Sequence, residues 1–285
     1  MKLKLFALAA LLTISIKGFS QDKNFYIFLA FGQSNMEGNA RYESQDTTVD
    51  ERFQVLSTSD CPKLNRVKDT WYKGKPPLCR CLTTLNPGDY FGRELVENLP
   101  KKIKIGIINV SVAGAKIEVF EKDNDKLQAY VGAQADWMKN IVKEYNGSPY
   151  NRLVELAKEA QKVGVIKGML LHQGESNSGD TLWTKKVKSV YDNLITDLKL
   201  NPKKTPLLAG ELVNADQKPN AKGKDMNKII ATLPQVLPNS YVISSAGCPQ
   251  RGDGLHFTAV GYRKIGRRYG AQMLTLLGVK HAPVE

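Results

Sequence analysis

Five short apolar segments, separated by stretches with helical periodicity, restrict the fold of this chain more than any other feature. Each segment is five to eight residues long and mostly apolar, as expected for a strand buried on both faces. The expected strands are residues 25–31, 103–110, 166–171, 206–212 and 240–244, and the expected helices are residues 89–99, 150–163, 181–200, 225–233 and 258–277. Strands that alternate with helices are typical of a parallel sheet covered on both faces. We therefore predict a single α/β domain, a three-layer α/β/α sandwich of flavodoxin-like type around a five-stranded parallel sheet.

A long stretch between the first strand and the first helix, residues 37–88, interrupts this alternation. It is rich in Thr, Lys, Pro and Asp, shows little periodicity and holds three of the four cysteines. Long irregular segments in compact domains are usually functional. We predict a loop insertion over the functional site, stapled by a disulfide. Residues 118–148 are ambiguous, although the spacing of Trp137, Ile141 and Tyr145 indicates a helix.

The four cysteines, Cys61, Cys79, Cys81 and Cys248, allow three disulfide pairings. A bond between Cys79 and Cys81 is sterically poor because the two residues are too close in sequence. Either remaining scheme joins Cys61 to one member of this close pair and Cys248 to the other. One bridge would then anchor the loop after Cys248 to the segment around residue 80. The alternative is that some of these thiols are free and buried.

The first twenty residues have the layout of a secretory signal peptide. Lys2 and Lys4 precede an apolar centre at residues 5–16, and Gly18-x-Ser20 supplies small residues for cleavage. We predict a mature chain that starts at Gln21, a domain of residues 21–285, and a secreted or periplasmic location. The apolar centre is shorter than the roughly 20 residues that span a bilayer, so we expect no membrane association of the mature form.

Charge and motif content argue against several classes of function. The formal charge is +13, but the basic residues are dispersed and no nucleic-acid-binding motif is present, so we expect no nucleic-acid partner. There is no phosphate-binding loop, no convincing dinucleotide fingerprint and no His-Glu-x-x-His pair. Because no His lies near Cys79 and Cys81, a zinc site is not expected either. We expect no cofactor and no metal, and the sequence does not indicate an oligomeric state.

Polar segments follow the expected strands at the positions where parallel sheets present ligand-binding residues. They are residues 32–35, 111–115 and 172–177. A fourth polar segment, residues 253–256, precedes the last expected helix. Together they supply Ser34 as a nucleophile, small residues with exposed backbone N–H groups, a side-chain amide, and Asp253 three residues before His256. A serine hydroxyl needs a histidine to take its proton, and that histidine works best when an acid holds its tautomer. This set of groups is the one that acyl transfer requires.

Four blocks in this order resemble those of the SGNH hydrolase superfamily. They are Gly32-Gln-Ser-Asn-Met36, the segment containing Gly114, His172-Gln-Gly-Glu-Ser-Asn177 and Asp253-Gly-Leu-His256. The first and third blocks resemble more narrowly carbohydrate esterase family six and the related sialate O-acetylesterases. The resemblance runs from about residue 26 to about residue 277. It implies a serine esterase that removes O-acetyl groups from carbohydrate through an acetyl-serine intermediate, and acetylated xylan as the substrate.

The resemblance also implies roles for individual residues. Ser34 would be the nucleophile, His256 the general base and Asp253 the group that orients His256. The oxyanion hole would consist of the N–H groups of Ser34 and Gly114 and the side-chain amide of Gln173. Much of the superfamily has an Asn in a Gly-x-Asn-Asp block at that third position, so Gln173 is assigned by analogy with the narrower family.

Several neighbouring residues have a supporting role or contact substrate in this interpretation. Glu175 is an alternative to Asp253 for holding the histidine, or it fixes the Ser34 loop. Asn35 either contacts substrate or caps the turn that follows. The other supporting residues are Gln33, His172, which is expected to be packed beside the site, and Glu211, which is expected to make a structural hydrogen bond. His281 is expected to be solvated, and the aromatic residues that either stack on sugar rings or belong to the core are Trp71, Tyr72 and Tyr90.

Alternative functions remain open at this level. O-acetylated sialic acid is a second substrate of the same class, because specificity would depend on the irregular insertion. A carbohydrate-binding module without catalysis would keep the aromatic residues but need not keep Ser34, Asp253 and His256 together. A lipase or thioesterase would require an apolar acyl channel.

Overall fold

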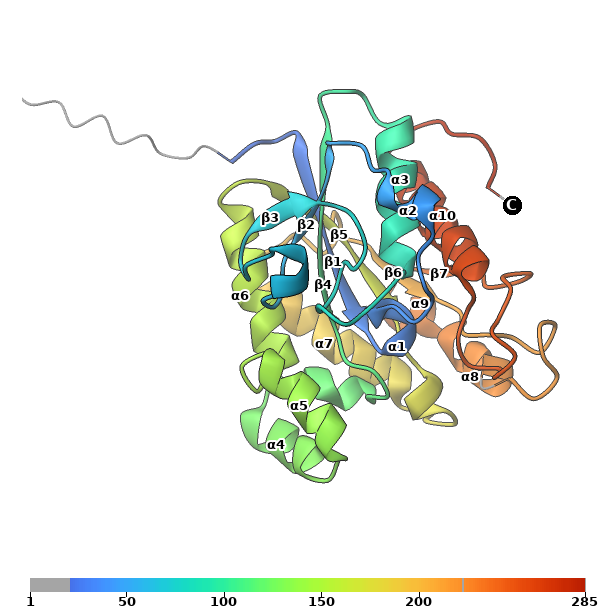
Figure 1. Ribbon diagram of the computed structural model, residues 1–285. Helices are drawn as coiled ribbons and strands as arrows, with labels where there is room; N and C mark the ends of the chain where they lie inside the picture. The colour runs from blue at the N-terminus through green and yellow to red at the C-terminus, as the bar shows by residue number, and fades with distance from the viewer. Residues whose placement is uncertain (1–20, 222, 285) are drawn as a thin grey trace, which may run out of the picture.

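The computed structural model describes residues 21–221 and 223–284, which form an α/β sandwich. The predicted signal peptide, residues 1–20, lies outside the described residues. Five parallel strands correspond to the predicted ones: β1 (Phe25–Gly32), β4 (Lys104–Ser111), β5 (Val165–His172), β6 (Leu207–Gly210) and β7 (Ser240–Ile243). The fold class is therefore confirmed, and Figure 1 shows the sheet with helices on either side.

The described sheet has seven strands rather than the predicted five, in the order β3-β2-β4-β1-β5-β6-β7. The two additional strands, β2 (Phe53–Leu56) and β3 (Trp71–Lys73), come from the stretch predicted to be a loop insertion. β2 runs parallel to β4, and β3 pairs with β2 in the antiparallel direction. Both are only three or four residues long. Their apolar pattern is therefore too short to stand out in a polar sequence.

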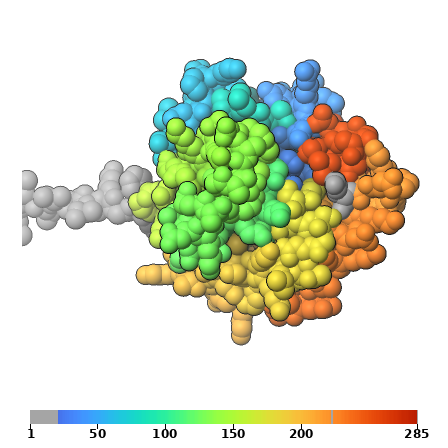
Figure 2. Space-filling model, turned by 90° about the horizontal axis from the view of Figure 1, so that it is seen from below, coloured from blue at the N-terminus to red at the C-terminus, as the bar shows by residue number. Residues whose placement is uncertain are grey.

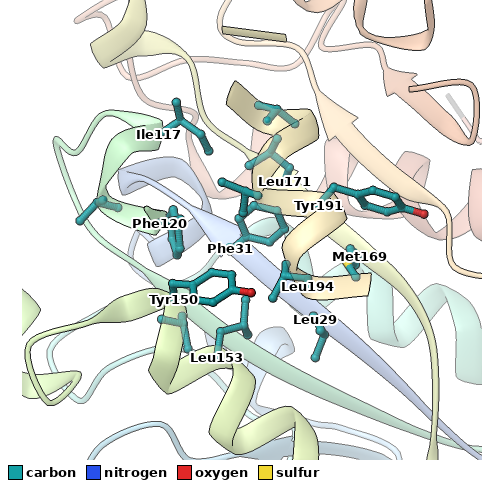
Figure 3. Packing of buried hydrophobic residues seen from close by; sticks show 14 of the residues in the cluster. Leu29, Phe31, Ile117, Phe120, Tyr150, Leu153, Met169, Leu171, Tyr191 and Leu194 are labelled. Atoms are coloured by element: carbon teal, nitrogen blue, oxygen red, sulfur yellow. The ribbon is translucent and has the colours of Figure 1, made fainter. Parts of the chain in front are cut away.

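Each face of the sheet is covered by helices, as the burial of β1 illustrates. Ile27, Leu29 and Phe31 point to one face, while Phe28 and Ala30 point to the other, and all five are fully buried. Successive side chains of a strand alternate between faces, so a strand in the middle of such a sandwich is apolar throughout. Figure 3 shows the first face, where Leu29 and Phe31 pack with Leu153, Tyr191 and Leu194.

Helices of the sandwich begin and end close to the predicted positions. The face of Phe31 is covered by α6 (Pro149–Gln161) and α7 (Trp183–Asp197), with α4 (Asn124–Gly132), α5 (Asp136–Glu144), η2 (Ile117–Phe120), α8 (Gly223–Ile230) and α9 (Leu233–Val236) around them. The face of Phe28 is covered by α3 (Pro87–Asn98) and α10 (Ala259–Leu276). The short elements are α1 (Ser34–Glu37), α2 (Ser44–Thr47), η1 (Pro62–Leu64) and η3 (Glu175–Asn177).

Capping residues fix the starts of the two helices on the second face. Asn86 accepts a hydrogen bond from the N–H of Gly88 (2.8 Å), and Asp89 accepts one from the N–H of Asn86 (3.0 Å), so α3 begins with a capping box. The Thr258 hydroxyl caps α10 by accepting from the N–H of Gly261 (3.2 Å). α10 therefore starts at Ala259, three residues after His256.

One disulfide is present among the described residues, between Cys61 and Cys81, and it staples the predicted insertion. Cys79 and Cys248 are both buried and free, so the predicted bridge to Cys248 is wrong. The Cys79 thiol packs against Tyr145 on one side of the sheet, whereas Cys248 lies in the core of the α10 side. Burial raises the pKa of both thiols to about 11. The loop before His256 is therefore not tied to the segment around residue 80.

The carboxyl ends of the parallel strands lie along one edge of the sheet. In Figure 1 this edge includes the turn from β1 into α1 at the lower side, and Figure 2 looks at it from below. Ligands of open α/β sheets bind outside these strand ends. Among the described helices, none is long and apolar enough to cross a membrane.

Candidate active site

A sharp turn at the end of β1 presents Ser34. Gly32 has φ +155° and lies so close to β5 that a Cβ atom would be 2.2 Å from the carbonyl oxygen of His172. The N–H of Gln33 donates to that same carbonyl (3.1 Å), and α1 begins at the next residue. Only glycine permits this close backbone approach, which explains the Gly immediately before Gln33-Ser34.

Ser34, His256 and Asp253 form a continuous chain of contacts. The Oγ atom of Ser34 lies 3.0 Å from Nε2 of His256, and Nδ1 of His256 lies 2.9 Å from Oδ2 of Asp253. With Nδ1–H donated to the carboxylate, Nε2 is left free to accept the serine proton. The two ends of the sequence are thus brought together, as the sequence analysis expected.

Asp253 is held by its own loop as well as by the histidine. Its Oδ1 accepts from the N–H groups of Leu255 and His256, each at 2.9 Å. Partial burial by itself would raise the pKa of this carboxyl group. The hydrogen bonds from the His256 backbone, the His256 ring and the Leu255 N–H outweigh that effect and lower the pKa to about 2. Asp253 is therefore ionised at ordinary pH.

Glu175, the alternative partner for the histidine, makes a different contact. Its Oε1 accepts from the side-chain amide of Asn35 at 2.6 Å. The same amide donates to the carbonyl of Leu255 (2.9 Å), and the Asn35 oxygen accepts from the Tyr262 hydroxyl (2.7 Å). Asn35 is fully buried, so it neither reaches substrate nor caps α1. It ties the Ser34 turn to the histidine loop and to α10.

The buried Glu175 side chain gives a stability prediction. Burial raises its pKa from the ordinary 4.5 to about 7, and Oε2 has no hydrogen-bond partner among the described residues. The folded state holds this proton more tightly than the unfolded state, so stability falls as pH rises from about 4.5 to about 7 and levels off above. Glu175→Gln keeps the oxygen that binds Asn35 and removes the ionisation.

We expect urea unfolding to show that the free energy of unfolding of Glu175→Gln rises relative to that of the parent chain as pH increases from 4 to 8. The difference between the two proteins should change by on the order of 3 kcal/mol over this range. The difference between variant and parent at each pH isolates this one group, because the other titrations are shared. If the difference in unfolding free energy between variant and parent is the same at pH 4 and pH 8, the assignment of Glu175 as a buried ionisable group is contradicted.

A cavity of about 410 Å³ opens beside Ser34. Its lining residues come from the four strand-end segments, with one contribution from the predicted insertion: Gln33, Ser34, Asn39, Ala113, Gly114, Glu175, Ser176, Leu255 and His256. Asn39 is the sole lining residue from 37–88 within the described chain. Most of the insertion therefore does not lie over the site, and that prediction is wrong. Two of its segments, β2 and β3, extend the sheet instead.

The backbone N–H groups of Ser34 and Gly114 belong to residues that line the cavity, and neither has an acceptor among the described residues. Gly114 has φ +66°, a left-handed conformation that favours glycine. The hydroxyl of Ser176 donates to the Gly114 carbonyl (2.7 Å) and fixes the orientation of this peptide. An oxyanion formed on a carbonyl carbon beside Ser34 requires donors of this kind.

Gln173 is not positioned as the third donor of the oxyanion hole, and that prediction needs correction. Its amide nitrogen already faces Asn177 Oδ1 (2.7 Å), Gln33 Oε1 (3.1 Å) and the Ala115 carbonyl (3.2 Å). Its oxygen accepts from the indole N–H of Trp183 at 2.5 Å. Gln173 is buried and does not line the cavity. Its contacts instead hold Gln33, whose oxygen also accepts from the N–H groups of Gly174 and Ser176.

His172 and Glu211 occupy supporting positions away from the cavity. His172 lies within β5, packs edge-on against Phe257 and is buried completely, and this burial lowers its pKa to about 3. Its imidazole is therefore neutral and is not a proton carrier at ordinary pH. Glu211 accepts from the N–H of Ser245 (3.0 Å), which joins the loops after β6 and β7.

The aromatic residues singled out in the sequence do not line the cavity. Trp71 packs against Phe25 with ring centroids 4.9 Å apart, and Tyr90 donates to Asp46 (2.8 Å). The Tyr72 hydroxyl accepts from the N–H of Val67 (2.8 Å). His281, which was expected to be solvated, is half-buried in the terminal tail, where its ring lies 3.0 Å from the Thr275 hydroxyl. No cluster of three His, Cys, Asp or Glu residues suited to a metal is found among residues 21–221 and 223–284.

A buried ion pair next to the cavity was not anticipated from the sequence. Glu37, three residues after Ser34, accepts from the guanidinium of Arg80 (2.7 and 3.2 Å) and from the N–H of Ala113 (3.3 Å). Arg80 also donates to Glu144 at the end of α5 (2.8 Å). Arg80 stands beside Cys81, so the disulfide holds its backbone. These contacts connect α1, the loop carrying Gly114 and α5.

Comparison with known proteins relates this geometry to a family. The family model described as carbohydrate esterase, sialic acid-specific acetylesterase matches residues 24–275. A structure from Arabidopsis thaliana has a TM-score of 0.65 at 20% identity, with 89% of this chain and 99% of that chain covered. NanS has a TM-score of 0.62 at 14% identity, covering 91% and 99%. A carbohydrate acetylesterase from Xanthomonas citri has a TM-score of 0.58 at 18% identity, covering 88% of this chain and 56% of that one.

Proposed function

The chain belongs to the carbohydrate esterase, sialic acid-specific acetylesterase family, and we propose that it is an exported serine esterase that uses Ser34, His256 and Asp253 to remove O-acetyl groups from carbohydrate. The observation that carries this proposal is the contact chain from Ser34 to Asp253 at the mouth of a cavity. Ser34 and Gly114, whose N–H groups have no acceptor among the described residues, line this same cavity.

The proposed reaction proceeds in two halves. Ser34 Oγ attacks the acetyl carbonyl carbon while His256 Nε2 takes the hydroxyl proton, and the N–H groups of Ser34 and Gly114 donate to the oxyanion. The C–O bond to the sugar then breaks, and the sugar oxygen takes the proton from His256. A water molecule, deprotonated by His256, attacks the acetyl-serine ester. Acetate leaves and Ser34 regains its proton.

Acetylated xylan is the proposed substrate, because the four sequence blocks resemble carbohydrate esterase family six. The second candidate is O-acetylated sialic acid, which the description of the matching family favours. The leader-like pattern of residues 1–20 supports secretion or export to the periplasm, with Gln21 as the first residue of the mature chain. Either substrate would then be met outside the cytoplasm.

A substrate panel on the purified mature chain tests the proposed function. We expect acetate release from acetylated xylan, and a kcat/KM that falls steeply from acetyl to hexanoyl and decanoyl esters of one alcohol, since most of the residues that line the cavity of about 410 Å³ have polar side chains. Faster turnover of O-acetylated sialic acid would select the second candidate. Preference for long acyl chains would contradict the proposal, as would binding of carbohydrate without any hydrolysis.

A further inference from the structure

We propose that the indole of Trp137 is the platform on which a sugar ring of the acetylated substrate stacks. This inference rests on the proposed function and adds the site that holds the carbohydrate part of the ester. The spacing of Trp137, Ile141 and Tyr145 indicated a helix. The helix α5 exists, and Ile141 and Tyr145 are buried, but Trp137 is 52% exposed.

The position of Trp137 distinguishes it from ordinary exposed apolar residues, which are common singly on protein surfaces. A Cβ atom on Gly114 would lie 2.7 Å from Cη2 and 3.4 Å from Cζ2 of the indole. The edge of the indole therefore lies against the residue whose N–H is proposed to meet the oxyanion. An acetyl group at Ser34 would have its sugar attached directly beyond the ester oxygen, next to this ring.

Sugar recognition suits an indole at this place. A pyranose ring presents faces of C–H groups, and the face of an aromatic ring carries negative charge density that attracts them. Of the other tryptophans, Trp183 is fully buried and Trp71 packs on Phe25 in the far part of the sheet. Trp137 is the exposed tryptophan, and its indole lies beside Gly114, which belongs to the cavity lining.

A chain of contacts fixes the position of Trp137 relative to Ser34. Trp137 lies in the first turn of α5, and Glu144 at the end of that helix accepts from Arg80. Arg80 also binds Glu37 of α1, the short helix that begins with Ser34. Figure 2 shows the segment containing α4 and α5, in green, as a ridge beside the blue residues of this edge. A fixed spacing between indole and serine favours one orientation of the bound sugar.

The experiment compares Trp137→Ala and Trp137→Phe on two substrates, an acetylated xylo-oligosaccharide and ethyl acetate, which has no ring to stack. We expect Trp137→Ala to raise KM for the oligosaccharide about tenfold and to lower kcat/KM for it far more than for ethyl acetate. Trp137→Phe should restore part of the oligosaccharide KM. The control is Leu182→Ala, which removes an equally exposed apolar side chain (53%) outside the cavity and should change neither substrate.

An equal loss of kcat/KM on both substrates would overturn the proposal, because the indole would then only support the Gly114 loop. Unchanged kinetics on both substrates would overturn it as well. Binding measured by calorimetry in the Ser34→Ala background separates this inference from the proposed reaction. Weaker binding of the acetylated oligosaccharide when Trp137→Ala is added supports the platform even if the parent chain releases no acetate. Unaltered binding refutes it even if the parent chain is a fast esterase.

Discussion

Ser34→Ala is expected to lower kcat for hydrolysis of acetylated xylan by about 10⁴-fold or more, the largest loss of any single substitution. Without the hydroxyl there is no oxygen to form the acetyl intermediate, and the neighbouring N–H groups alone give only residual catalysis. KM should change little, because the side chain occupies a small part of the cavity. Steady-state acetate release, with circular dichroism to verify folding, measures this.

Ser176→Ala is the matched control for this substitution. Ser176 also lines the cavity, but its hydroxyl donates to the Gly114 carbonyl (2.7 Å) and not to His256. Its removal should cost roughly tenfold at most, by loosening the Gly114 peptide. If Ser176→Ala were the inactive variant and Ser34→Ala retained activity, the assignment of the nucleophile would be wrong.

His256→Ala should be nearly as damaging as Ser34→Ala, since His256 is the side chain that hydrogen-bonds the Ser34 hydroxyl within residues 21–221 and 223–284. Asp253→Asn is expected to cost about 10²- to 10⁴-fold in kcat, because an amide can favour the wrong imidazole tautomer. Because Asp253 is half exposed, with 42% of its side chain accessible, water can replace part of its effect. His281→Ala, in the terminal tail and outside the cavity, is the histidine control and should have full activity.

Glu175→Gln separates the two acids proposed from the sequence. Its carboxylate binds Asn35 rather than His256, so the variant should retain most of its activity while Asp253→Asn loses it. A reversed order, with Glu175→Gln inactive and Asp253→Asn active, would mean that Glu175 orients the histidine after a rearrangement.

Periodicity was enough to predict the central part of the fold. Strands such as β1 and β5 are buried on both faces, which leaves a continuous apolar signal in the sequence, and long helices such as α7 and α10 repeat theirs over many turns. β2 and β3 were missed because a strand of three or four residues gains its stability from pairing with a neighbour. That pairing is a tertiary contact, and the local sequence does not report it.

Spacing and residue type also indicated where the chemistry would gather, but not which way each side chain would point. Gln173 lies in the expected segment, yet its amide turns to Asn177 and Gln33 inside the protein. The pairing of Cys61 with Cys81 belonged to one of two open schemes. Whether Cys248 is bonded or free depended on which side of the sheet each thiol lies. Such orientations follow from packing between segments that are distant in the sequence.

The contacts that connect the site elements had no sequence signal at all. Arg80 and Glu37 are 43 residues apart, and nothing local marks them as partners. The spacing of Trp137 indicated only a helix, and the fold shows that its indole is exposed and lies against Gly114. The contact between Gly114 and Trp137 can be recognised only when the positions of both residues in the fold are known.

Covalent labelling tests the central claim, that folding brings a reactive hydroxyl at Ser34 against His256, most directly. The mature chain is treated with diethyl p-nitrophenyl phosphate, which phosphorylates activated serines, and the adduct is located by peptide mass spectrometry. The account predicts one adduct, on Ser34, with labelling that slows strongly in His256→Ala. An unmodified Ser34, or an adduct on Ser176 or another serine, would contradict it.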